Sequence, residues 1–356
     1  MYKKYFLIFL FFIFINISYS TSFSSCTTLS SGTWELNSSL TQSGGNCIEI
    51  TGDNVILDCQ NNNITGDGTG IGIYVTGDYA NVSNCNIFNF NLGVQPFTSS
   101  NNTFSFNGVH NNLYGFSLTS SSSSNTLISN TAKNNSRGIY SASNSNQSLM
   151  SNILLNNADG IYLSTGYNHS LISNIFTNNS NGITLLSGSN NILINNSISD
   201  SDSVAVSIVS SSNNILISNN LINNNQGVSF SSAENNILTE NTILNNSVLN
   251  LMFFAFSGGP YTNLIYDNDL GNISKISSND WSFFENQFNL STQGNRYLNE
   301  SFSIGTFCFD PDNCDYSAIF SPLISPEINF SSTTSSLPFG SVLISMLLLF
   351  SFFIIY

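Results

Sequence analysis

The stretch NNILISNN, residues 213–220, has near-copies on both sides: NNILINNS at 190–197 and NNILTENT at 235–242. The copies begin 23 and 22 residues apart, and their alignment extends into columns of one residue type. In chain order the columns hold Leu127, Leu149, Leu171, Leu193, Leu216 and Leu238; Asn130, Asn152, Asn174, Asn196, Asn219 and Asn241; Ala132, Leu154, Phe176, Ile198, Leu221 and Ile243; and Gly138, Gly160, Gly182, Ala205 and Gly227. Looser copies continue towards the N-terminus through Phe104, Asn107, Val109, Gly115 and Phe116, and through Val82, Cys85, Ile87, Gly93 and Val94.

The pattern inside each copy indicates strands. Apolar and polar residues alternate in GIYL (160–163) and GITL (182–185), which is the period of a strand. Gly and Asn every few residues are unfavourable in helices. Short strands joined by polar turns, with a period of about 22 residues, are typical of a parallel β-helix. We therefore predict an all-β fold: a right-handed, single-stranded parallel β-helix of roughly ten rungs over residues 26–280.

Each column has a structural interpretation in such a solenoid, because every residue stacks on its equivalent one rung away. The leucines are expected to form a continuous inner column. The asparagines are expected at turns, where Asn tolerates left-handed geometry and bonds its own backbone, and where stacked amides can bond one another as a ladder. The column glycine is expected to supply a positive φ or a tight corner, although Ala205 occupies the same position in one copy.

The composition excludes some partners. Charged residues make up only 7% of the 356 residues, and the formal net charge is −14 with six Lys plus Arg. A nucleic-acid surface needs basic groups to neutralise phosphates, so no nucleic-acid partner is expected. An anionic membrane surface is disfavoured for the same reason. The regular Leu, Ile and Phe argue against disorder.

Both ends of the chain carry hydrophobic segments. MYKKYFLIFLFFIFINISYS (1–20) predicts a secretory signal peptide, with an uncleaved N-terminal anchor as the alternative. LPFGSVLISMLLLFSFFIIY (337–356) has twenty residues without a charge, so it can span a membrane or be exchanged for a lipid. We predict an exported, cell-surface, membrane-anchored protein. Its segments are a signal peptide (1–20), a β-helix (21–280), a C-terminal cap with Trp281, Phe283 and Phe284 (281–325), a Ser/Thr linker (326–336), and a transmembrane or sorting tail (337–356).

Export predicts oxidised cysteines. The chain has six, at positions 26, 47, 59, 85, 308 and 314. An even number split four and two fits three disulfides, of which Cys308–Cys314 closes a small loop by itself. The other four allow three pairings, and we favour Cys26–Cys47 with Cys59–Cys85. A metal cluster is the alternative, but the spacings lack C-x-x-C.

The columns resemble the right-handed β-helix repeats of the NosD-type and carbohydrate-binding-and-hydrolase (CASH) superfamily. CIEITGDNVILDCQNNNITGDGTGIGIYV (47–75) and NVSNCNIFNFNLGV (81–94) are similar to the start of secreted archaeal β-helix surface proteins. The resemblance covers residues 26–325. It implies the fold strongly and the function weakly, because the superfamily includes lyases, hydrolases, epimerases, adhesins and surface-layer proteins. NosD members are linked with copper delivery, but two histidines and four methionines are few for a soft copper site, and we do not predict one.

The C-terminal segment carries the one predicted metal site. QGNRYLNE (293–300) and FDPDNCDYSAIFSPLI (309–324) resemble a degenerate form of the family's terminal segment. Asp310, Asp312 and Asp315 lie within six residues, and such oxygen ligands suit a structural Ca²⁺ ion. The loop lacks the glycine that an EF-hand-like loop uses for its turn. The alternative is an acidic, solvated cap loop, and no other cofactor is expected.

The polysaccharide enzymes implied by the resemblance need a carboxylate cluster, often with an Arg or Lys base. The repeats offer only Asp159, Asp200, Asp202, Glu234, Glu240, Lys133 and Arg137. Arg137 and Asp159 precede the column glycine in adjacent rungs, which predicts a structural cross-rung ion pair worth about 0–1 kcal/mol.

The other carboxylates and the histidines are predicted to be structural as well. Asp200 and Asp202 are predicted turn residues. Asp267 and Asp269 can pair or belong to a turn. Asp53, Asp58, Asp67 and Asp78 are scattered, and His110 and His169 can be turn residues. No catalytic residues are predicted.

Fourteen N-x-[ST] sequons follow residue 20, and each can carry a glycan if it is exported and exposed. They lie at Asn37, Asn63, Asn81, Asn101, Asn134, Asn146, Asn168, Asn178, Asn195, Asn245, Asn272, Asn289, Asn299 and Asn329. The prediction from sequence is a non-catalytic cell-surface or envelope protein that binds glycans or other surface partners. The alternatives are a polysaccharide lyase or glycoside hydrolase, and a structural surface-layer spacer.

Overall fold

The computed structural model describes residues 20–119, 121–255, 259, 261–272, 275–279, 286–290, 293–298, 303–310 and 313–321, of which 289, 290, 293, 298 and everything after 302 are described by backbone alone. These residues belong to one compact unit that extends to Pro322. The predicted signal peptide up to residue 19, the linker and the hydrophobic tail lie outside the described residues. Within the described ranges, no helix is both long enough and apolar enough to cross a membrane.

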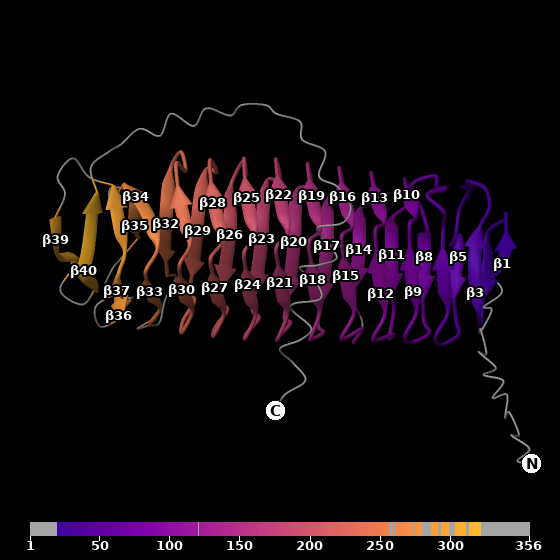
Figure 1. Ribbon diagram of the computed structural model, residues 1–356, viewed down its shortest axis with the longest axis horizontal. Coiled ribbons are helices and arrows are strands. Elements are labelled where there is room, and N and C mark those ends of the chain that lie inside the picture. Colours follow the sequence, from indigo (N-terminus) through magenta and orange to yellow (C-terminus); the bar gives the residue numbers. More distant parts are fainter. Residues whose placement is uncertain are drawn as a thin grey trace, which may run out of the picture. The chain divides into compact units, whose positions relative to one another are not determined.

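The chain winds into a parallel β-solenoid of about eleven turns, close to the ten predicted. In the described part of the chain each turn adds one strand to each of three sheets, here called A, B and C, which run along the molecule (Figure 1). The predicted all-β fold and the period are confirmed; the handedness stays a prediction. Sheet A consists of β1 (Ser20–Phe23), β3 (Thr33–Leu36), β6 (Ile56–Asp58), β9 (Asn81–Ser83), β12 (Thr103–Ser105), β15 (Thr126–Ile128), β18 (Ser148–Met150), β21 (Ser170–Ile172), β24 (Ile192–Ile194), β27 (Ile215–Ile217), β30 (Ile237–Thr239) and β33 (Leu264–Tyr266).

Sheets B and C form the other two sides of the solenoid. Sheet B consists of β2 (Thr27–Leu29), β5 (Ile48–Ile50), β8 (Ile71–Val75), β11 (Leu92–Pro96), β14 (Tyr114–Leu118), β17 (Arg137–Ala142), β20 (Asp159–Ser164), β23 (Asn181–Leu186), β26 (Val204–Val209), β29 (Gln226–Ser231), β32 (Leu249–Phe254) and β35 (Ile276–Ser278). Sheet C consists of β4 (Leu40–Thr41), β7 (Asn63–Thr65), β10 (Asn86–Phe88), β13 (Gly108–His110), β16 (Thr131–Lys133), β19 (Ile153–Leu155), β22 (Ile175–Thr177), β25 (Ser197–Ser199), β28 (Asn220–Ile222), β31 (Thr242–Leu244), β34 (Asp269–Asn272), β38 (Arg296–Leu298), β40 (Asn313–Ser321) and β39 (Ser303–Asp310).

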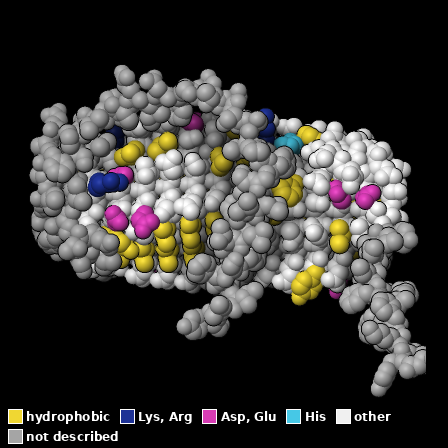
Figure 2. Space-filling view, in the orientation of Figure 1, with side chains coloured by type: hydrophobic (Ala, Val, Ile, Leu, Met, Phe, Trp, Pro, Cys, Tyr) yellow, Lys and Arg dark blue, Asp and Glu magenta, His cyan; other side chains and the backbone are white. Residues whose placement is uncertain are grey.

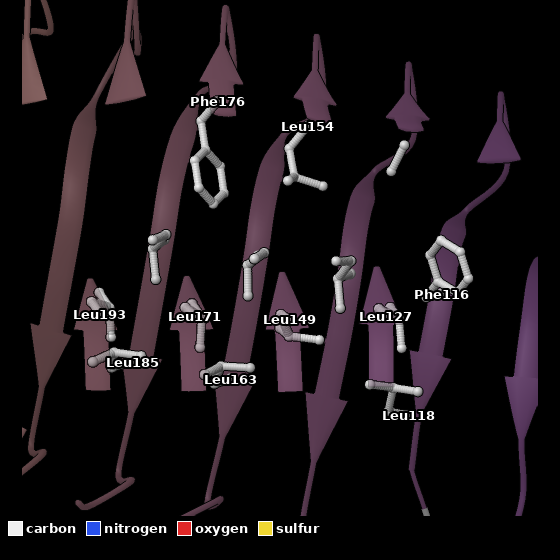
Figure 3. Close-up of a cluster of buried hydrophobic side chains, with 14 of the residues drawn as sticks. Phe116, Leu118, Leu127, Leu149, Leu154, Leu163, Leu171, Phe176, Leu185 and Leu193 are labelled. Atoms are coloured by element: carbon white, nitrogen blue, oxygen red, sulfur yellow. The ribbon is translucent and has the colours of Figure 1, made fainter. Parts of the chain in front are cut away.

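The core runs along the inside of the three sheets. The predicted leucine column lies in sheet A with every member fully buried, and the Ala132–Ile243 column faces it from sheet C. Neighbouring rungs pair in register, so Leu149 stacks directly on Leu171 (Figure 3). Because each leucine is covered by those above and below, the stack buries apolar surface that a single rung would leave exposed.

The positive φ offered as one role for the column glycines was wrong. Gly138, Gly160, Gly182 and Gly227 are not among the residues with positive φ. Instead, a Cβ at Gly160 would lie 2.6 Å from the Gly182 carbonyl oxygen and 2.7 Å from Phe176 Cδ1. The column therefore holds glycine, or Ala205 in one rung, because the next rung and the core approach closely, not because the backbone is left-handed.

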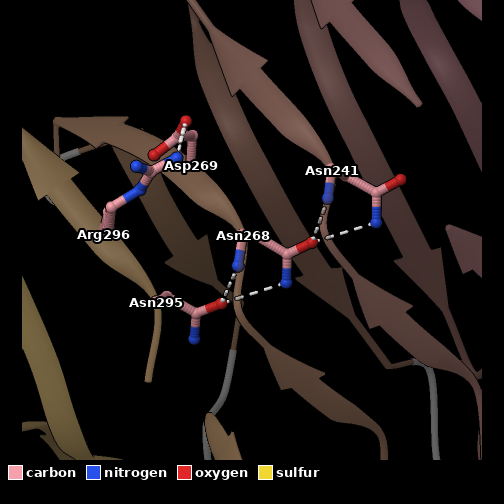
Figure 4. Close-up of polar contacts among 5 residues, drawn as sticks. All are labelled: Asn241, Asn268, Asp269, Asn295 and Arg296. Carbon is pink, nitrogen blue, oxygen red and sulfur yellow. Dashed lines mark hydrogen bonds and ion pairs between the residues drawn. The ribbon is translucent and has the colours of Figure 1, made fainter. Parts of the chain in front are cut away.

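The predicted asparagine ladder is confirmed, and it is one of three. The predicted column runs between sheets A and C, and further ladders run between C and B, and between B and A. In each ladder the side-chain oxygen accepts bonds from the backbone N–H and the amide of the asparagine one rung earlier, as from Asn241 to Asn268 and from Asn268 to Asn295 (Figure 4). The ladders pair the buried amide groups of the corners, whereas His169 Nε2 and Ser201 Oγ are buried at such corners without a hydrogen-bond partner among the described residues.

The left-handed geometry predicted for the column asparagines was wrong for that column. It belongs to the residue before each ladder position, such as Ser151 at φ 53° and Ser173 at φ 54°. The ladder residue itself is buried and turns its amide along the stack. At these corners the left-handed residue changes the chain direction, and the buried residue after it forms the ladder bonds.

Two disulfides close the N-terminal rungs. Cys26 bonds Cys47 and Cys59 bonds Cys85, as predicted. Cys308 lies opposite Cys314 in the antiparallel β39–β40 pair, but their side chains lie outside the described residues, so the third disulfide stays a prediction. Trp281, Phe283 and Phe284 of the predicted cap also lie outside the described residues; β36 (Asn289–Leu290) and β37 (Gln293–Gly294) pair close by in sequence.

Candidate functional site

The outer face of sheet B carries a cluster of aromatic and charged side chains on three adjacent strands. The register of β14, β17 and β20 places Tyr114, Arg137 and Asp159 in one outward row. A second row three residues on brings Tyr140 beside Tyr162. We call these five residues the tyrosine–arginine patch.

Arg137 lies at the centre of the patch. Its guanidinium carbon is 3.9 Å from the ring centroid of Tyr162, 4.7 Å from that of Tyr140 and 5.5 Å from that of Tyr114. The rings are themselves in contact, with centroids 5.0 Å apart for Tyr114–Tyr140 and 5.9 Å for Tyr140–Tyr162. Each ring face attracts the cation, so Arg137 links the three tyrosines into one continuous platform.

Asp159 completes the patch electrostatically. Arg137 Nε donates to Asp159 Oδ2 at 3.2 Å, and Asn181 Nδ2 donates to Asp159 Oδ1 at 2.9 Å. The predicted cross-rung ion pair is therefore confirmed. Both side chains keep some exposure, 25% and 15%, which limits the contribution of the pair to stability.

The polar ends of the patch have spare hydrogen-bonding capacity. Within the part of the chain that the structure describes, no residue bonds the hydroxyl groups of Tyr114, Tyr140 or Tyr162. The Nη groups of Arg137 likewise have no bond to a described residue. Sequence reasoning missed the tyrosines. The signal was the 22-residue step from Tyr140 to Tyr162, which begins three residues after Arg137.

The other predicted acidic positions are not brought together as a catalytic cluster. Asp200 and Asp202 line a polar pocket of about 450 Å³ between asparagine side chains, and Asp200 is left-handed as its turn assignment requires. Asp269 pairs with Arg296 rather than with Asp267 (Figure 4). Across the described ranges no three His, Cys, Asp or Glu side chains form a group that could hold a metal.

The scattered N-terminal carboxylates accept hydrogen bonds within turns and between neighbouring rungs. Asp58 accepts bonds from Gln60 and from the Asn84 amide one rung on. Asp53 accepts the backbone N–H of Asp78, and Asp78 accepts that of Ser100. Thr69 donates to Asp67 through its hydroxyl and its backbone, which lowers the pKa of that carboxyl. These contacts give each carboxylate a structural role.

The histidines lie in two different parts of the solenoid. His110 stacks on Phe88 with centroids 5.1 Å apart, on the outer face of sheet C beside Lys133. Burial, and then the nearby Lys133, lowers its pKa. His169 replaces an asparagine in the ladder between sheets B and A, where burial lowers its pKa to about 4.

The predicted calcium ligands fall on the β39–β40 hairpin. Asp310 lies opposite Asn313, and Asp315 lies opposite Phe307. Asp312 and all three side chains lie outside the described residues. The calcium site therefore stays a prediction.

A protein-family comparison finds one model, described as periplasmic copper-binding protein (NosD), which matches residues 48–226 and 128–312. Comparison with curated protein sequences finds no match. Among solved structures, the Azotobacter vinelandii mannuronan C-5 epimerase AlgE4 A-module is similar with TM-score 0.55 and 15% identity, over 78% of this chain and 88% of that chain.

Two further structures are similar in the same way. The Dettilon tailspike protein (gp208) has TM-score 0.61 and 15% identity, over 81% of this chain and 64% of that chain. DFA-IIIase from Arthrobacter chlorophenolicus A6, in complex with DFA-III, has TM-score 0.55 and 11% identity, over 71% of this chain and 74% of that chain. At these identities the similarities show the fold alone.

The family description names copper, so the question is whether the described His, Met and Cys side chains could form a copper site. His110 is on the outer face of sheet C, whereas His169 is at a corner between sheets B and A. Nδ1 of His169 is taken up as the acceptor of the Gln147 backbone N–H. Met150 is on sheet A and Met252 is on sheet B. All four described N-terminal cysteines are disulfide-bonded. Clustered soft ligands are not formed by the described side chains, so these residues do not fit a copper site.

Proposed function

The chain belongs to the NosD family, and on that premise we propose that it is an exported, non-catalytic β-helix protein that binds glycans on the tyrosine–arginine patch of sheet B. The observation that carries the proposal is the continuous platform of three tyrosines around Arg137. Sugar rings have apolar C–H faces and hydroxyl edges. The tyrosine rings can stack on the faces, while their hydroxyls and the Arg137 Nη groups can bond the edges.

The charge of the chain favours a neutral glycan. The formal net charge of −14 repels a polyanion at low salt. Arg137 is the cation of the patch, and Asp159 already neutralises it. A neutral sugar that uses stacking and hydrogen bonds is therefore the favoured class.

Export and surface display are the second part of the proposal. The two N-terminal disulfides fit an oxidising compartment, and the family description names the periplasm. Anchoring through residues 337–356, by a membrane span or a lipid, belongs to the proposal because those residues lie outside the described part of the chain.

An enzyme acting on polysaccharides is the alternative function. Its support is that two of the similar structures are named as an epimerase and as DFA-IIIase. The same face would then do chemistry, with Asp159 and Arg137 as the ionisable groups. In this arrangement both Asp159 oxygens already accept hydrogen bonds, which favours binding over proton transfer.

The exported chain should be incubated with a panel of plant, algal and microbial polysaccharides, with and without Ca²⁺. We expect saturable retention on at least one neutral polysaccharide, competed by its oligosaccharides, with no new reducing ends and no absorbance from unsaturated uronides. Release of either product by a folded protein would establish the enzyme instead. A spacer would bind nothing on the panel.

A further inference from the structure

The outer face of sheet A carries an apolar surface that is separate from the patch on sheet B. Strands β21, β24, β27 and β30 present isoleucines at their first or third position, stacked rung on rung. These are Ile172, Ile192, Ile194, Ile215, Ile217 and Ile237. Ile128 and Met150 continue the row on β15 and β18. We call this surface the isoleucine face.

The isoleucine face has no charge of its own. Sheet A has seven strands from β15 to β33, and none of them contains a charged residue. Figure 2 shows rows of hydrophobic side chains over this part of sheet A, next to acidic side chains at its border. The same rungs present Thr184, Ser207 and Ser229 on the outer face of sheet B. Sheet C also exposes Ile153 and Ile175, but Lys133, Ser197 and Ser199 interrupt its outer face. The apolar rows are therefore more continuous on sheet A, and contiguous apolar surfaces mark interaction sites.

We propose that the isoleucine face docks against the same face of a second copy of this chain, in an antiparallel two-fold pair. The stacked rows have the spacing of the rungs in both copies, so ridges of one copy fit between ridges of the other, as in two packed sheets. An isologous contact of this kind needs no other partner.

The size of the face suits a dimer. Seven strands about 4.8 Å apart give the apolar centre a length of roughly 30 Å. With β12 included, the surface that overlaps in this arrangement has eight strands. It is roughly 40 Å long and about 15 Å wide with its corners, or about 600 Å² for each copy and about 1,200 Å² in total, the lower end of the standard interface size. Thr126, Ser148 and Ser170 lie at the outer positions of β15, β18 and β21. An apolar centre with a polar rim is the usual anatomy of an interface of that size.

Phe106 supplies an anchor at one end. It follows β12 directly and is 63% exposed, with a left-handed φ of 56°. The equivalent residues of the following rungs are Ser129, Ser151 and Ser173. A bulky residue rarely adopts this conformation. In the antiparallel pair Phe106 of one copy meets the Leu264 end of the second copy.

The charges at the border of the isoleucine face favour an antiparallel pair over a parallel pair, and a protein partner over a membrane surface. Glu240 and Asp267 lie at the C-terminal end of the face. A parallel pair would bring these acids together, whereas an antiparallel pair brings them against the uncharged β12–β15 end. Lys and Arg are missing from the strands of the face, and basic residues are what attracts a surface helix or sheet to anionic lipids.

The test is sedimentation velocity of the unit ending at Pro322, which has its own continuous core, over concentrations up to about 50 µM. A reversible dimer is expected, and its dissociation constant should fall as salt is added because acidic copies repel each other. The pair Ile172→Asn and Ile194→Asn should raise the dissociation constant at least tenfold. The matched pair Ile153→Asn and Ile175→Asn, whose residues are 43% and 48% exposed on sheet C, should leave it unchanged.

Phe106→Asn separates docking from folding. Asn accepts the left-handed backbone, so the variant should unfold at the same or a higher temperature and still dimerise more weakly. A wild-type monomer at the highest concentration would overturn the proposal. Equal effects of the two isoleucine pairs would also overturn it, as would a monomer that binds phosphatidylcholine vesicles through this face.

Discussion

Replacing Asn174 with Ala is expected to lower the free energy of unfolding by about 4 kcal/mol. Asn174 Oδ1 accepts from both the backbone N–H and the amide of Asn152, and Asn174 Nδ2 donates to the Leu149 carbonyl and to Asn196. Alanine leaves these groups unpaired at a fully buried corner. Each unpaired buried group costs about 1–3 kcal/mol, and water has no access to replace the lost bonds.

Urea unfolding followed by circular dichroism measures this loss. The control is Asn178→Gly in the next corner of the same rung, because Asn178 is exposed and has φ 54°, which glycine adopts freely. The control is expected to change the free energy of unfolding by less than about 1 kcal/mol. Equal losses in the two variants would mean that buried ladders do not stabilise the corners.

Lowering the pH from 6.5 to 4 is expected to destabilise the protein by about 3 kcal/mol through His169 alone. Nδ1 of His169 accepts the Gln147 backbone N–H at 3.1 Å, and Nε2 is buried without a partner. The ring must therefore stay neutral, and burial lowers its pKa to about 4 from the usual 6.5. Because the unfolded chain takes up the proton first, stability is full above pH 6.5 and is lost as the pH falls towards 4.

The variant His169→Asn isolates this effect. Asparagine occupies the same position in the following rungs, where Asn214 and Asn236 accept the same type of bond. The difference in unfolding free energy between wild type and variant should therefore grow as the pH falls through this window. His110→Asn is the comparison, since His110 lies on an outer face and should account for a smaller part of the pH dependence. Parallel pH profiles for wild type and His169→Asn would contradict the account.

The fold was predictable from the sequence because each rung repeats the same inward residues. A column such as Leu149, Leu171 and Leu193 defines the period directly, and a parallel stack is the arrangement that buries it. Two of the three ladders were missed, because adjacent pairs such as Asn134 and Asn135 look like ordinary turn residues. The two members of such a pair differ only in the structure, where Asn134 is exposed and left-handed and Asn135 is buried.

The period becomes irregular near the C-terminus, which explains why that end was harder to predict. Asn268 follows Asn241 by 27 residues, and Asn295 follows by another 27. The ladder continues, but the longer turns hide it from an alignment at 22 or 23 residues. Sheet C consequently extends to β40, beyond the predicted end of the solenoid at residue 280.

The tyrosine–arginine patch could be predicted only in part. Sequence spacing placed Arg137 beside Asp159, because both precede the column glycine. The contact of Arg137 with the rings of Tyr140 and Tyr162 depends on the directions of outward side chains three residues apart. The outer face of sheet B changes residue type from rung to rung at these positions, from Ser117 to Tyr140, Tyr162 and Thr184, so the alignment contained little information about it.

Affinity electrophoresis tests the proposed binding site most directly. Wild type, Tyr140→Ala with Tyr162→Ala, and the control Tyr167→Ala should run in gels that contain the polysaccharide selected by the panel. Tyr167 is 51% exposed at a corner away from the patch. The account predicts that the double variant loses retardation, while wild type and control are retarded equally. The dissociation constant of the double variant should be at least tenfold higher, a loss of about 1.4 kcal/mol of binding free energy. Equal retardation of all three proteins would show that the glycan binds elsewhere.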